Sequence, residues 1–306
     1  MIRSVLAPLD GSRFAEFALP PAVEIARRAG ARLRLALIHE SPAGVAPGNA
    51  GAALAAGLRE REEAYLQEVA GRLDPSGTLP VETLHQPGSA GPALVKIIEE
   101  GHDDLVVMAT HGRGPVTAAW LGSVADYVLR HATVPVLLLR PEPGQEPVYG
   151  PSGWRRILVP LDASPQSEVA LSPALDLLDL FGDSGVRLTL LTVVEPVLGA
   201  GDPGLPFALP PDPALLDTLR LGAERRLEEV AAGLSGRGLM VDLAVQTGVQ
   251  PAHAILETAR EGEYELIAMT THGAGGLRRL LLGSVADKVI RASSAPVLVV
   301  RPGPVR

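Results

Sequence analysis

Cysteine is absent from the 306-residue chain, and lysine and asparagine are almost absent. Without cysteine the protein can hold neither a disulfide scaffold nor a thiolate metal site, and the composition fits a reducing compartment. Lys96 and Lys288 are the only lysines and Asn49 is the only asparagine, so nearly every basic residue is an arginine. This bias is compatible with a GC-rich genome and equally with a warm habitat.

Long apolar runs are also missing, since no uninterrupted segment approaches the ~18 residues that span a bilayer. The first apolar run ends at Asp10, too early for a signal peptide. A formal net charge of −8 disfavours nonspecific binding to nucleic acid or anionic membranes. With a hydrophobic content of 46%, the chain is expected to be globular and cytoplasmic, without nucleic-acid or membrane partners.

The most informative feature is a motif that occurs twice. Residues 110–126 read THG, nine residues, then GSVAD, and residues 271–287 repeat this spacing. Upstream, the apolar run and turn of 5–12 match 157–164. A period of about 150 residues indicates a duplicated domain rather than a solenoid. We therefore predict one domain over residues 1–141, a linker rich in proline and glycine over 142–153, and a second domain over 154–306.

Apolar runs alternate with helical patterns in both copies, which predicts βαβ units and a parallel sheet with right-handed crossovers. In the first copy strands are expected at 2–7, 32–39, 79–85, 104–109 and 134–139, with helices at 13–29, 58–73, 91–101 and 122–132. In the second copy strands are expected at 155–161, 186–194, 240–246, 265–270 and 296–300.

The first helix of each copy carries clear start signals. Ser12 and Ser164 are placed as N-caps, and Pro165 lies where proline is tolerated in the first turn. Pro21 and Pro173 fall at equivalent positions inside this helix, and each removes a backbone hydrogen bond. A kink is therefore expected in both helices.

The last strand of each copy is too apolar to remain an exposed edge. Pro135, however, disfavours a central position in the sheet. The simplest arrangement lets the two final strands meet and cover each other, which would make the chain an internal pseudo-dimer.

The glycine-marked loop before each GSVAD helix favours anion binding. Glycines let the backbone approach a ligand closely, and the free N–H groups of a first helical turn favour phosphate. A structural alternative exists, because Ser123-x-x-Asp126 and Ser284-x-x-Asp287 also match a helix capping box. Capping does not account for Gly122 and Gly283, so phosphate binding is the preferred interpretation.

Asp10 and Asp162 end the first strand of their copies, at the sheet edge where open α/β proteins bind ligands. A carboxylate there can accept a hydrogen bond from an adenine amine or a ribose hydroxyl, or help to hold a phosphate-bound metal. The alternative is a turn-forming aspartate. Because both copies keep the aspartate while Gly11 becomes Ala163, the functional role is favoured.

His111 and His272 follow the fourth strands, but neither has a nucleophile or a second histidine at metal-ligand spacing. A role in organising the loop or at the edge of the phosphates is preferred over acid–base catalysis. Arg113 could reach a phosphate, although the second copy has Ala274 there. The other histidines share no spacing and are assigned no role: His39, His85, His102, His131 and His253.

Several nucleotide-binding motifs are absent from the sequence. There is no G-x-x-x-x-G-K-[ST], which excludes a P-loop NTPase, and no G-x-G-x-x-G after the first strand, which disfavours an ordinary dinucleotide-binding domain. No nucleophile elbow or zinc motif is present either.

With two glycine loops at this spacing, the chain resembles a tandem universal stress protein of the ATP-binding type over nearly its whole length. The resemblance implies two adenine-nucleotide α-hydrolase-like domains of the α/β class. Each would have a five-stranded parallel sheet of order 3-2-1-4-5 with helices on both faces, and the domains would pair through their fifth strands. It also implies a stress-response sensor or regulator with one potential ATP site per domain.

The resemblance places adenine, ribose and phosphates on matching positions of the two copies. In the first copy the implied site is Pro8, Asp10, Ile38, Met108, Ala109, His111, Gly112, Arg113, Gly122, Ser123 and Val124. In the second copy it is Leu161, Asp162, Val193, Met269, Thr270, His272, Gly273, Gly283, Ser284 and Val285. A divalent ion, Mg²⁺ or Mn²⁺, is expected on the ATP phosphates, and no metal ligands are assigned to protein side chains.

The sequence departs from the family pattern at its first glycine, which is Ala109 in one copy and Thr270 in the other. The bulkier Thr270 could crowd a ribose or hydrogen-bond to it. Two other functions stay open: a slow ATPase or nucleotidyl-transfer enzyme, and an interaction module that binds no nucleotide. Two such chains could also associate as a homodimer.

Overall fold

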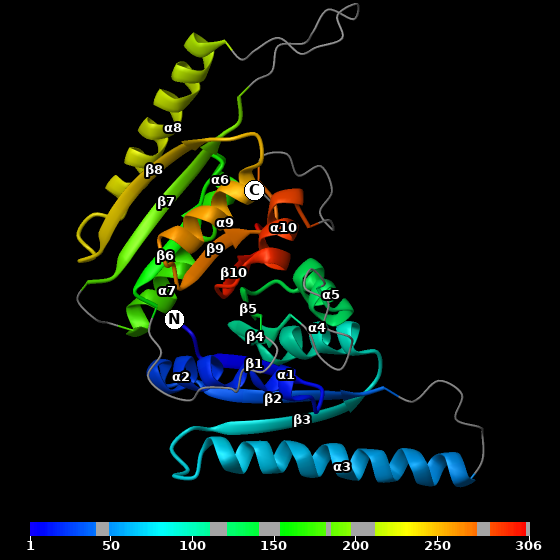
Figure 1. Ribbon diagram of the computed structural model, residues 1–306. Coiled ribbons are helices and arrows are strands. Elements are labelled where there is room, and N and C mark those ends of the chain that lie inside the picture. Colours follow the sequence, from blue (N-terminus) through cyan, green and yellow to red (C-terminus); the bar gives the residue numbers. More distant parts are fainter. Residues whose placement is uncertain are drawn as a thin grey trace, which may run out of the picture.

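The computed structural model describes residues 1–40, 49–110, 121–140, 154–181, 185–196, 212–273 and 282–303. The linker predicted at 142–153 lies outside the described residues, so the domain boundaries stay a prediction. Within the described chain, the same succession of strands and helices occurs twice, and the α/β class predicted from the alternating pattern is confirmed (Figure 1).

The elements of the first half are β1 (Ser4–Leu9), α1 (Arg13–Glu16), α2 (Leu19–Ala29), β2 (Arg32–His39), α3 (Asn49–Leu73), β3 (Val81–Pro87), α4 (Ala90–Gly101), β4 (Leu105–Ala109), α5 (Ser123–His131) and β5 (Val136–Leu139). Those of the second half are β6 (Arg156–Pro160), α6 (Pro165–Glu168), α7 (Leu171–Phe181), β7 (Arg187–Val194), α8 (Pro213–Gly233), β8 (Met240–Thr247), α9 (Pro251–Glu261), β9 (Leu266–Thr270), α10 (Ser284–Ala292) and β10 (Val297–Val300). Helix α3 begins nine residues before the expected start at residue 58.

All these strands form one sheet of ten, in the order β3-β2-β1-β4-β5-β10-β9-β6-β7-β8. Within each half every pairing is parallel. The halves meet where β5 and β10 pair in antiparallel register, with Leu137 opposite Leu298. Neither half therefore leaves its most apolar strand as an edge.

The prolines at this joint lie just outside the strands. Strand β5 begins at Val136, one residue after Pro135. The carbonyl of Pro135 still accepts a hydrogen bond from the Val106 amide, and Pro296 accepts one from Ile267 in the same way. Proline thus contributes an acceptor at the start of each strand, where its missing N–H removes no ladder bond.

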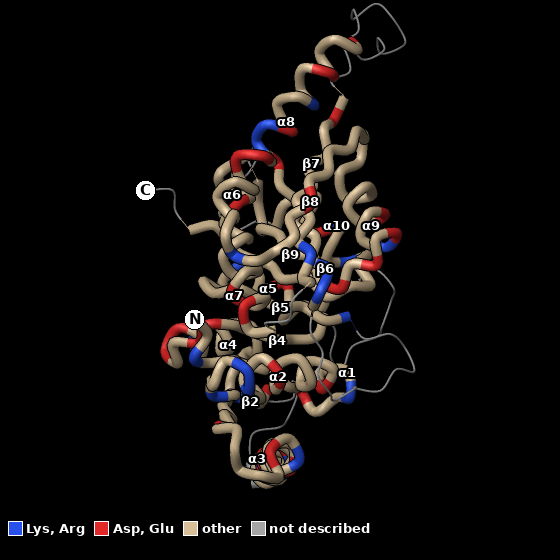
Figure 2. Tube along the Cα trace, turned by 90° about the vertical axis from the view of Figure 1, so that its left-hand side faces the viewer, with Lys and Arg blue, Asp and Glu red and all other residues tan. Residues whose placement is uncertain are grey.

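Two apolar cores cover the two faces of the sheet, and each core contains residues of both halves. One face packs against α2, α3, α7 and α8, and the other against α4, α5, α9 and α10. Helices α3 and α8 lie at opposite ends of the molecule (Figures 1 and 2). Since both faces are covered, the central strands β4, β5 and β10 are apolar throughout.

The first helix of each half is broken rather than kinked, so that expectation is wrong. Helix α1 ends with Phe17 as its C-cap, and α6 ends with Val169. The carbonyls of Phe17 and Val169 lie four residues before Pro21 and Pro173, which have no N–H to donate to them. The chain therefore starts a new helix in each half. The N-cap prediction is confirmed, since the Ser12 and Ser164 side chains accept from backbone amides of their first turns.

None of the described helices is long and apolar enough to cross a membrane.

Candidate nucleotide site

The second half contains a cavity of about 620 Å³ at the carboxyl edge of its strands. Pocket volumes of roughly 300–1,000 Å³ are typical of small-molecule sites. Every residue assigned to the second-half site from the sequence lines this cavity: Leu161, Asp162, Val193, Met269, Thr270, His272, Gly273, Gly283, Ser284 and Val285. The fold thus brings together residues that are up to 124 positions apart.

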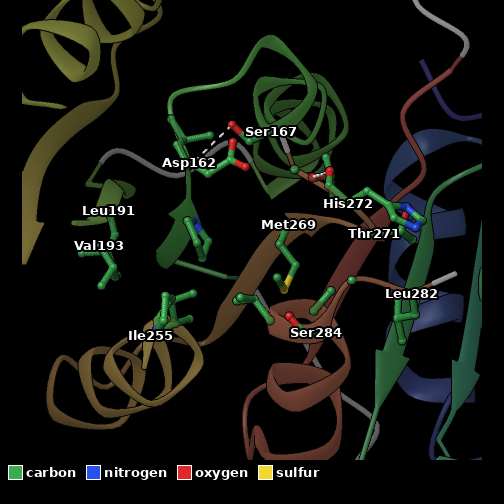
Figure 3. A pocket seen from close by; sticks show the side chains of 18 of the residues that line it. Asp162, Ser167, Leu191, Val193, Ile255, Met269, Thr271, His272, Leu282 and Ser284 are labelled. Atoms are coloured by element: carbon green, nitrogen blue, oxygen red, sulfur yellow. Dashed lines mark hydrogen bonds between the residues drawn. The ribbon is translucent and has the colours of Figure 1, made fainter. Parts of the chain in front are cut away.

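The cavity has an apolar end and a polar end. Figure 3 shows Leu191, Val193 and Ile255 grouped at one end, with Met269 between them and Ser284. The loop that carries His272 lies on the opposite side from the apolar group (Figure 3). A flat apolar ring and a charged tail on one molecule would match these two ends.

Asp162 closes the turn that follows β6. Its Oδ1 accepts hydrogen bonds from the Ser164 amide, at 3.1 Å, and from the Ser164 hydroxyl, at 2.5 Å. The Asp162 amide in turn donates to Ser167 Oγ at 3.3 Å. Asp10 makes the same turn in the first half, accepting from the Ser12 amide at 2.9 Å. Both aspartates therefore have a turn-forming role, and each lies at the ligand edge of its sheet.

Two glycines of the second loop are required by close approaches. A Cβ on Gly273 would lie 1.7 Å from Asp162 Oδ2, and one on Gly283 would lie 2.9 Å from the Thr271 carbonyl oxygen. The Gly283 amide donates to that same carbonyl at 2.8 Å, as Gly122 does to Thr110. The glycines thus fold the loop back onto the end of β9 and bring α10 to the cavity.

The capping-box alternative is wrong for both motif helices. The N-caps are Gly122 and Gly283, and neither helix has a side-chain capping bond. The serines lie one position later, inside the first turn. The acidic residues pair with arginines one turn ahead instead: Asp126 with Arg130 and Asp287 with Arg291, each at 2.8 Å.

As a result, α10 begins without a side-chain acceptor for its first amides. The N–H groups of a first helical turn have no partner within the helix. Ser284, Val285 and Ala286 form this turn and line the cavity. With the positive end of the helix dipole, such groups are chemically suited to an anion.

His272 organises the loop at the cavity wall. Its Nδ1 lies 3.0 Å from Thr271 Oγ1, and its carbonyl oxygen accepts from Thr270 Oγ1 at 2.8 Å. Burial lowers the pKa of His272, and the charges of Arg301 and Arg130 lower it further. Thr270 stands where the first glycine of the expected glycine pattern would be, and its hydroxyl holds the loop through this hydrogen bond.

The first-half site is described only in part. His111, Gly112 and Arg113 lie outside the described residues. The others lie at the corresponding edge of the first sheet, with Met108 and Ala109 buried at the end of β4: Pro8, Asp10, Ile38, Gly122, Ser123 and Val124.

Sequence reasoning missed several residues of the second cavity. Ser167, Leu191 and Ile255 line it from three elements that carry no motif. Leu191 could have been found, because it lies two residues before Val193 and shares its strand face. Ile255 lies on α9, and only the packing of that helix on the sheet brings it to the cavity.

Comparison with known proteins gives a consistent result for both halves. The model of the universal stress protein family matches residues 1–140 and 153–301. A universal stress protein of Mycobacterium tuberculosis is 31% identical over 215 residues, which are 69% of this chain and 65% of that protein. The chain thus spans about two thirds of the length of that relative. One from Methanocaldococcus jannaschii is 32% identical over 152 residues, 50% of this chain and 85% of its own.

Solved structures show the same architecture over the whole chain. The crystal structure of a universal stress protein from Archaeoglobus fulgidus superimposes with a TM-score of 0.70 at 23% identity, covering 98% of this chain and 97% of that one. A putative universal stress protein from Pseudomonas aeruginosa gives a TM-score of 0.63 at 20% identity, covering 98% and 94%. At such identities the likeness concerns the fold alone.

Proposed function

Because the chain belongs to the universal stress protein family, we propose that the cavity of its second half binds ATP and that the protein acts as a nucleotide-dependent regulator of the stress response. The observation that carries this proposal is the cavity of about 620 Å³ with an apolar end and the uncapped start of α10 at its polar end. The adenine ring would pack between Val193 and Ile255. The phosphates would receive hydrogen bonds from the amides of Ser284 and Val285.

The charge of the cavity favours a triphosphate that carries a divalent cation. Among the described residues that line it, none is a lysine or an arginine, and Asp162 and Glu195 are acidic. A bare triphosphate would be repelled by these carboxylates. Mg²⁺ or Mn²⁺ bound to the phosphates would reverse this interaction, because both cations prefer oxygen ligands. Asp162 and Glu195 are the side chains that could contact such an ion.

A regulatory role suits this site better than fast phosphoryl transfer. Phosphoryl transfer needs positioned cations and an oriented nucleophile. From the part of the chain that the structure describes, the cavity receives backbone amides and a loop histidine whose pKa is lowered. Slow ATP hydrolysis is an alternative that a phosphate-release assay tests. Association of two chains is a separate question that light scattering tests.

The proposal is tested by titrating the purified full chain with Mg-ATP in a calorimeter. In the variant Val193→Trp the indole fills the apolar end of the second cavity. Ile38→Trp makes the same change at the corresponding position of β2 and serves as the matched control. We expect Val193→Trp to weaken binding at the second site at least ~10-fold, the loss of one favourable pocket contact, and Ile38→Trp to leave this site unchanged.

Each outcome bears on the proposal. A wild-type chain that binds no ATP at millimolar concentration, or a Val193→Trp variant that binds as well as wild type, overturns it. Loss of half the stoichiometry in each variant supports the proposal and adds a site in the first half. Melting temperatures of the free variants, compared with wild type, show whether either substitution disturbs the fold.

A further inference from the structure

The first half holds a partly buried cluster of polar side chains on the face of its sheet that α3 covers, opposite the face to which Ile38 points. His39 at the end of β2, His85 on β3 and Glu62 on α3 converge between the sheet and the helix. Glu62 Oε2 lies 2.8 Å from His39 Nδ1 and 2.9 Å from His85 Nε2. One ligand atom from each residue falls within 4.8 Å of the other two.

We propose that His39, Glu62 and His85 bind a divalent transition-metal ion of the zinc class. Two imidazole nitrogens and one carboxylate form a ligand set that Zn²⁺ accepts, with water as a fourth ligand. With bonds of roughly 2.0–2.1 Å, ligand atoms of tetrahedral zinc lie about 3.3 Å apart. The two separations from Glu62 Oε2, 2.8 Å and 2.9 Å, need to widen slightly, and the coordinating nitrogens of His39 and His85, which lie within 4.8 Å of each other, need to adopt the same spacing.

The surroundings of His85 provide an independent argument. Its second nitrogen, Nδ1, lies 3.3 Å from Glu63 Oε1. Histidines that bind metals almost always donate their other N–H to an acceptor of this kind, and Glu63 would take that role once the ion displaces the proton from Nε2. Glu62 and Glu63 are adjacent on α3, so one turn of this helix supplies a ligand and a second carboxylate beside the other nitrogen of His85.

The carboxylate is poised to act as an anionic ligand. Burial alone would raise the pKa of Glu62, but the hydrogen bonds from His85 and His39 outweigh this effect and lower it. The Glu62 side chain is 17% exposed and that of His85 is 10% exposed, so an ion can reach the cluster from solvent. His39 is buried at 1% exposure and closes the inner side.

The second half shows that this polar cluster is not needed for the fold. By strand and helix register, the positions of His39, Glu62 and His85 correspond there to Val194, Ala223 and Val245. Helix α8 packs on β7 and β8 with these apolar residues just as α3 packs on β2 and β3. The first half therefore carries a polar cluster that the architecture does not require, and its residue types and spacing are those of a metal site.

The test uses the full chain, stripped with a chelator and titrated with Zn²⁺ against a chromophoric competitor. Wild type should bind one Zn²⁺ per chain with a rise in melting temperature. The double variant His39→Val/His85→Val, which carries the residues of the second half, should bind this ion at least roughly 100-fold more weakly. Glu63→Gln should weaken binding about 10-fold. Four-coordinate Co²⁺, added in place of zinc, should give visible absorption bands in wild type and none in the double valine variant.

His253→Gln is the control for adventitious binding, because His253 and Glu257 form an exposed pair 4.0 Å apart on α9. The variant His253→Gln should bind Zn²⁺ as wild type does. The proposal is overturned if wild type binds Zn²⁺ no more tightly than the double valine variant, or if the loss follows His253. Circular dichroism of each stripped variant checks that the fold is intact. We expect it to be intact in the double valine variant, because the second half folds with valine at both corresponding positions.

Discussion

The two halves share one architecture but stabilise it with different buried chemistry. On β2 of the first half, Arg34 Nη1 binds Asp103 Oδ2 at 2.6 Å, and both side chains are almost completely buried. The Ser4 hydroxyl donates to the same carboxylate at 2.6 Å. In the second half, the corresponding pair is Thr189 and Tyr264, whose hydroxyls lie 2.7 Å apart.

A shared glycine makes room for either pair. A Cβ on Gly101 would lie 1.8 Å from Arg34 Nη1, and one on Gly262 would lie 2.2 Å from the Tyr264 ring. The backbone thus tolerates an ion pair or a neutral hydrogen bond at one position, as long as the glycine remains. Sheet order and apolar packing are therefore common to both halves of this fold, whereas the buried polar pairs differ between them.

The largest expected difference between the halves concerns the buried ion pair of Arg34 and Asp103. Asp103→Ala removes the buried partner of the Arg34 guanidinium and leaves it the half-exposed Glu82, at 3.1 Å, as its ion-pair partner; since breaking a buried ion pair typically costs about 3–5 kcal/mol, a loss of up to this size is expected. Urea denaturation of the variant should show this decrease in the free energy of unfolding. The double variant Arg34→Thr/Asp103→Tyr, which imports the second half's pair, should recover most of it. A single variant with wild-type stability would show that the ion pair contributes nothing.

The turn after the first strand gives a second, smaller effect. Gly11 and Ala163 occupy the same left-handed conformation, with φ of 80° and 62°. An L-residue pays roughly 1–2 kcal/mol in this region, whereas glycine does not. Ala163→Gly should therefore raise the free energy of unfolding by up to about 1 kcal/mol, and Gly11→Ala should lower it by a similar amount. Thermal melts should show a higher melting temperature for Ala163→Gly and a lower one for Gly11→Ala. Shifts in the same direction for both variants would refute the argument.

Removing one oxygen from the second half should have a comparable or slightly lower cost. Tyr264→Phe deletes the hydrogen bond to Thr189 and leaves that buried hydroxyl without its donor, at about 1 kcal/mol. The loss should be several-fold smaller than for Asp103→Ala, measured in the same denaturant series. Losses of equal size would mean that charge has no special weight at this position.

The smallest effect concerns pH. Because burial and two arginine charges lower the pKa of His272 in the fold, the unfolded chain binds the proton more readily. Stability should be complete above the unfolded value of about 6.5 and fall as the pH drops below it. His272→Gln should flatten this part of the stability profile between pH 7.5 and pH 5, and His253→Gln, an exposed control, should leave it unchanged. An identical slope in His272→Gln would contradict the assignment.

Much of the fold could be predicted because its signals are local. The apolar run that became β2 was placed at 32–39, and the structure has β2 at Arg32–His39. The duplicated loops predicted the family, which the match over both halves confirms. These features depend on sequence neighbours and on spacing, both of which a single sequence displays.

What escaped prediction depends on contacts between distant elements. Gly122 rather than Ser123 became the N-cap because the glycine amide folds back onto Thr110. His39 and His85 shared no sequence spacing, and only the pairing of β2 with β3 places them on one face. Glu62 joins them because α3 covers that face. A one-dimensional pattern has no access to such three-element convergence.

The antiparallel joint between β5 and β10 also changes what mutation can do. In an assembly of two identical chains, every substitution appears twice, related by the symmetry axis. Here the two halves belong to one chain, so a histidine can arise in one half while the corresponding residue of the other half stays valine. Covalent duplication thus lets the two halves of one continuous sheet diverge independently, and a ligand site can evolve in one half without appearing in the other.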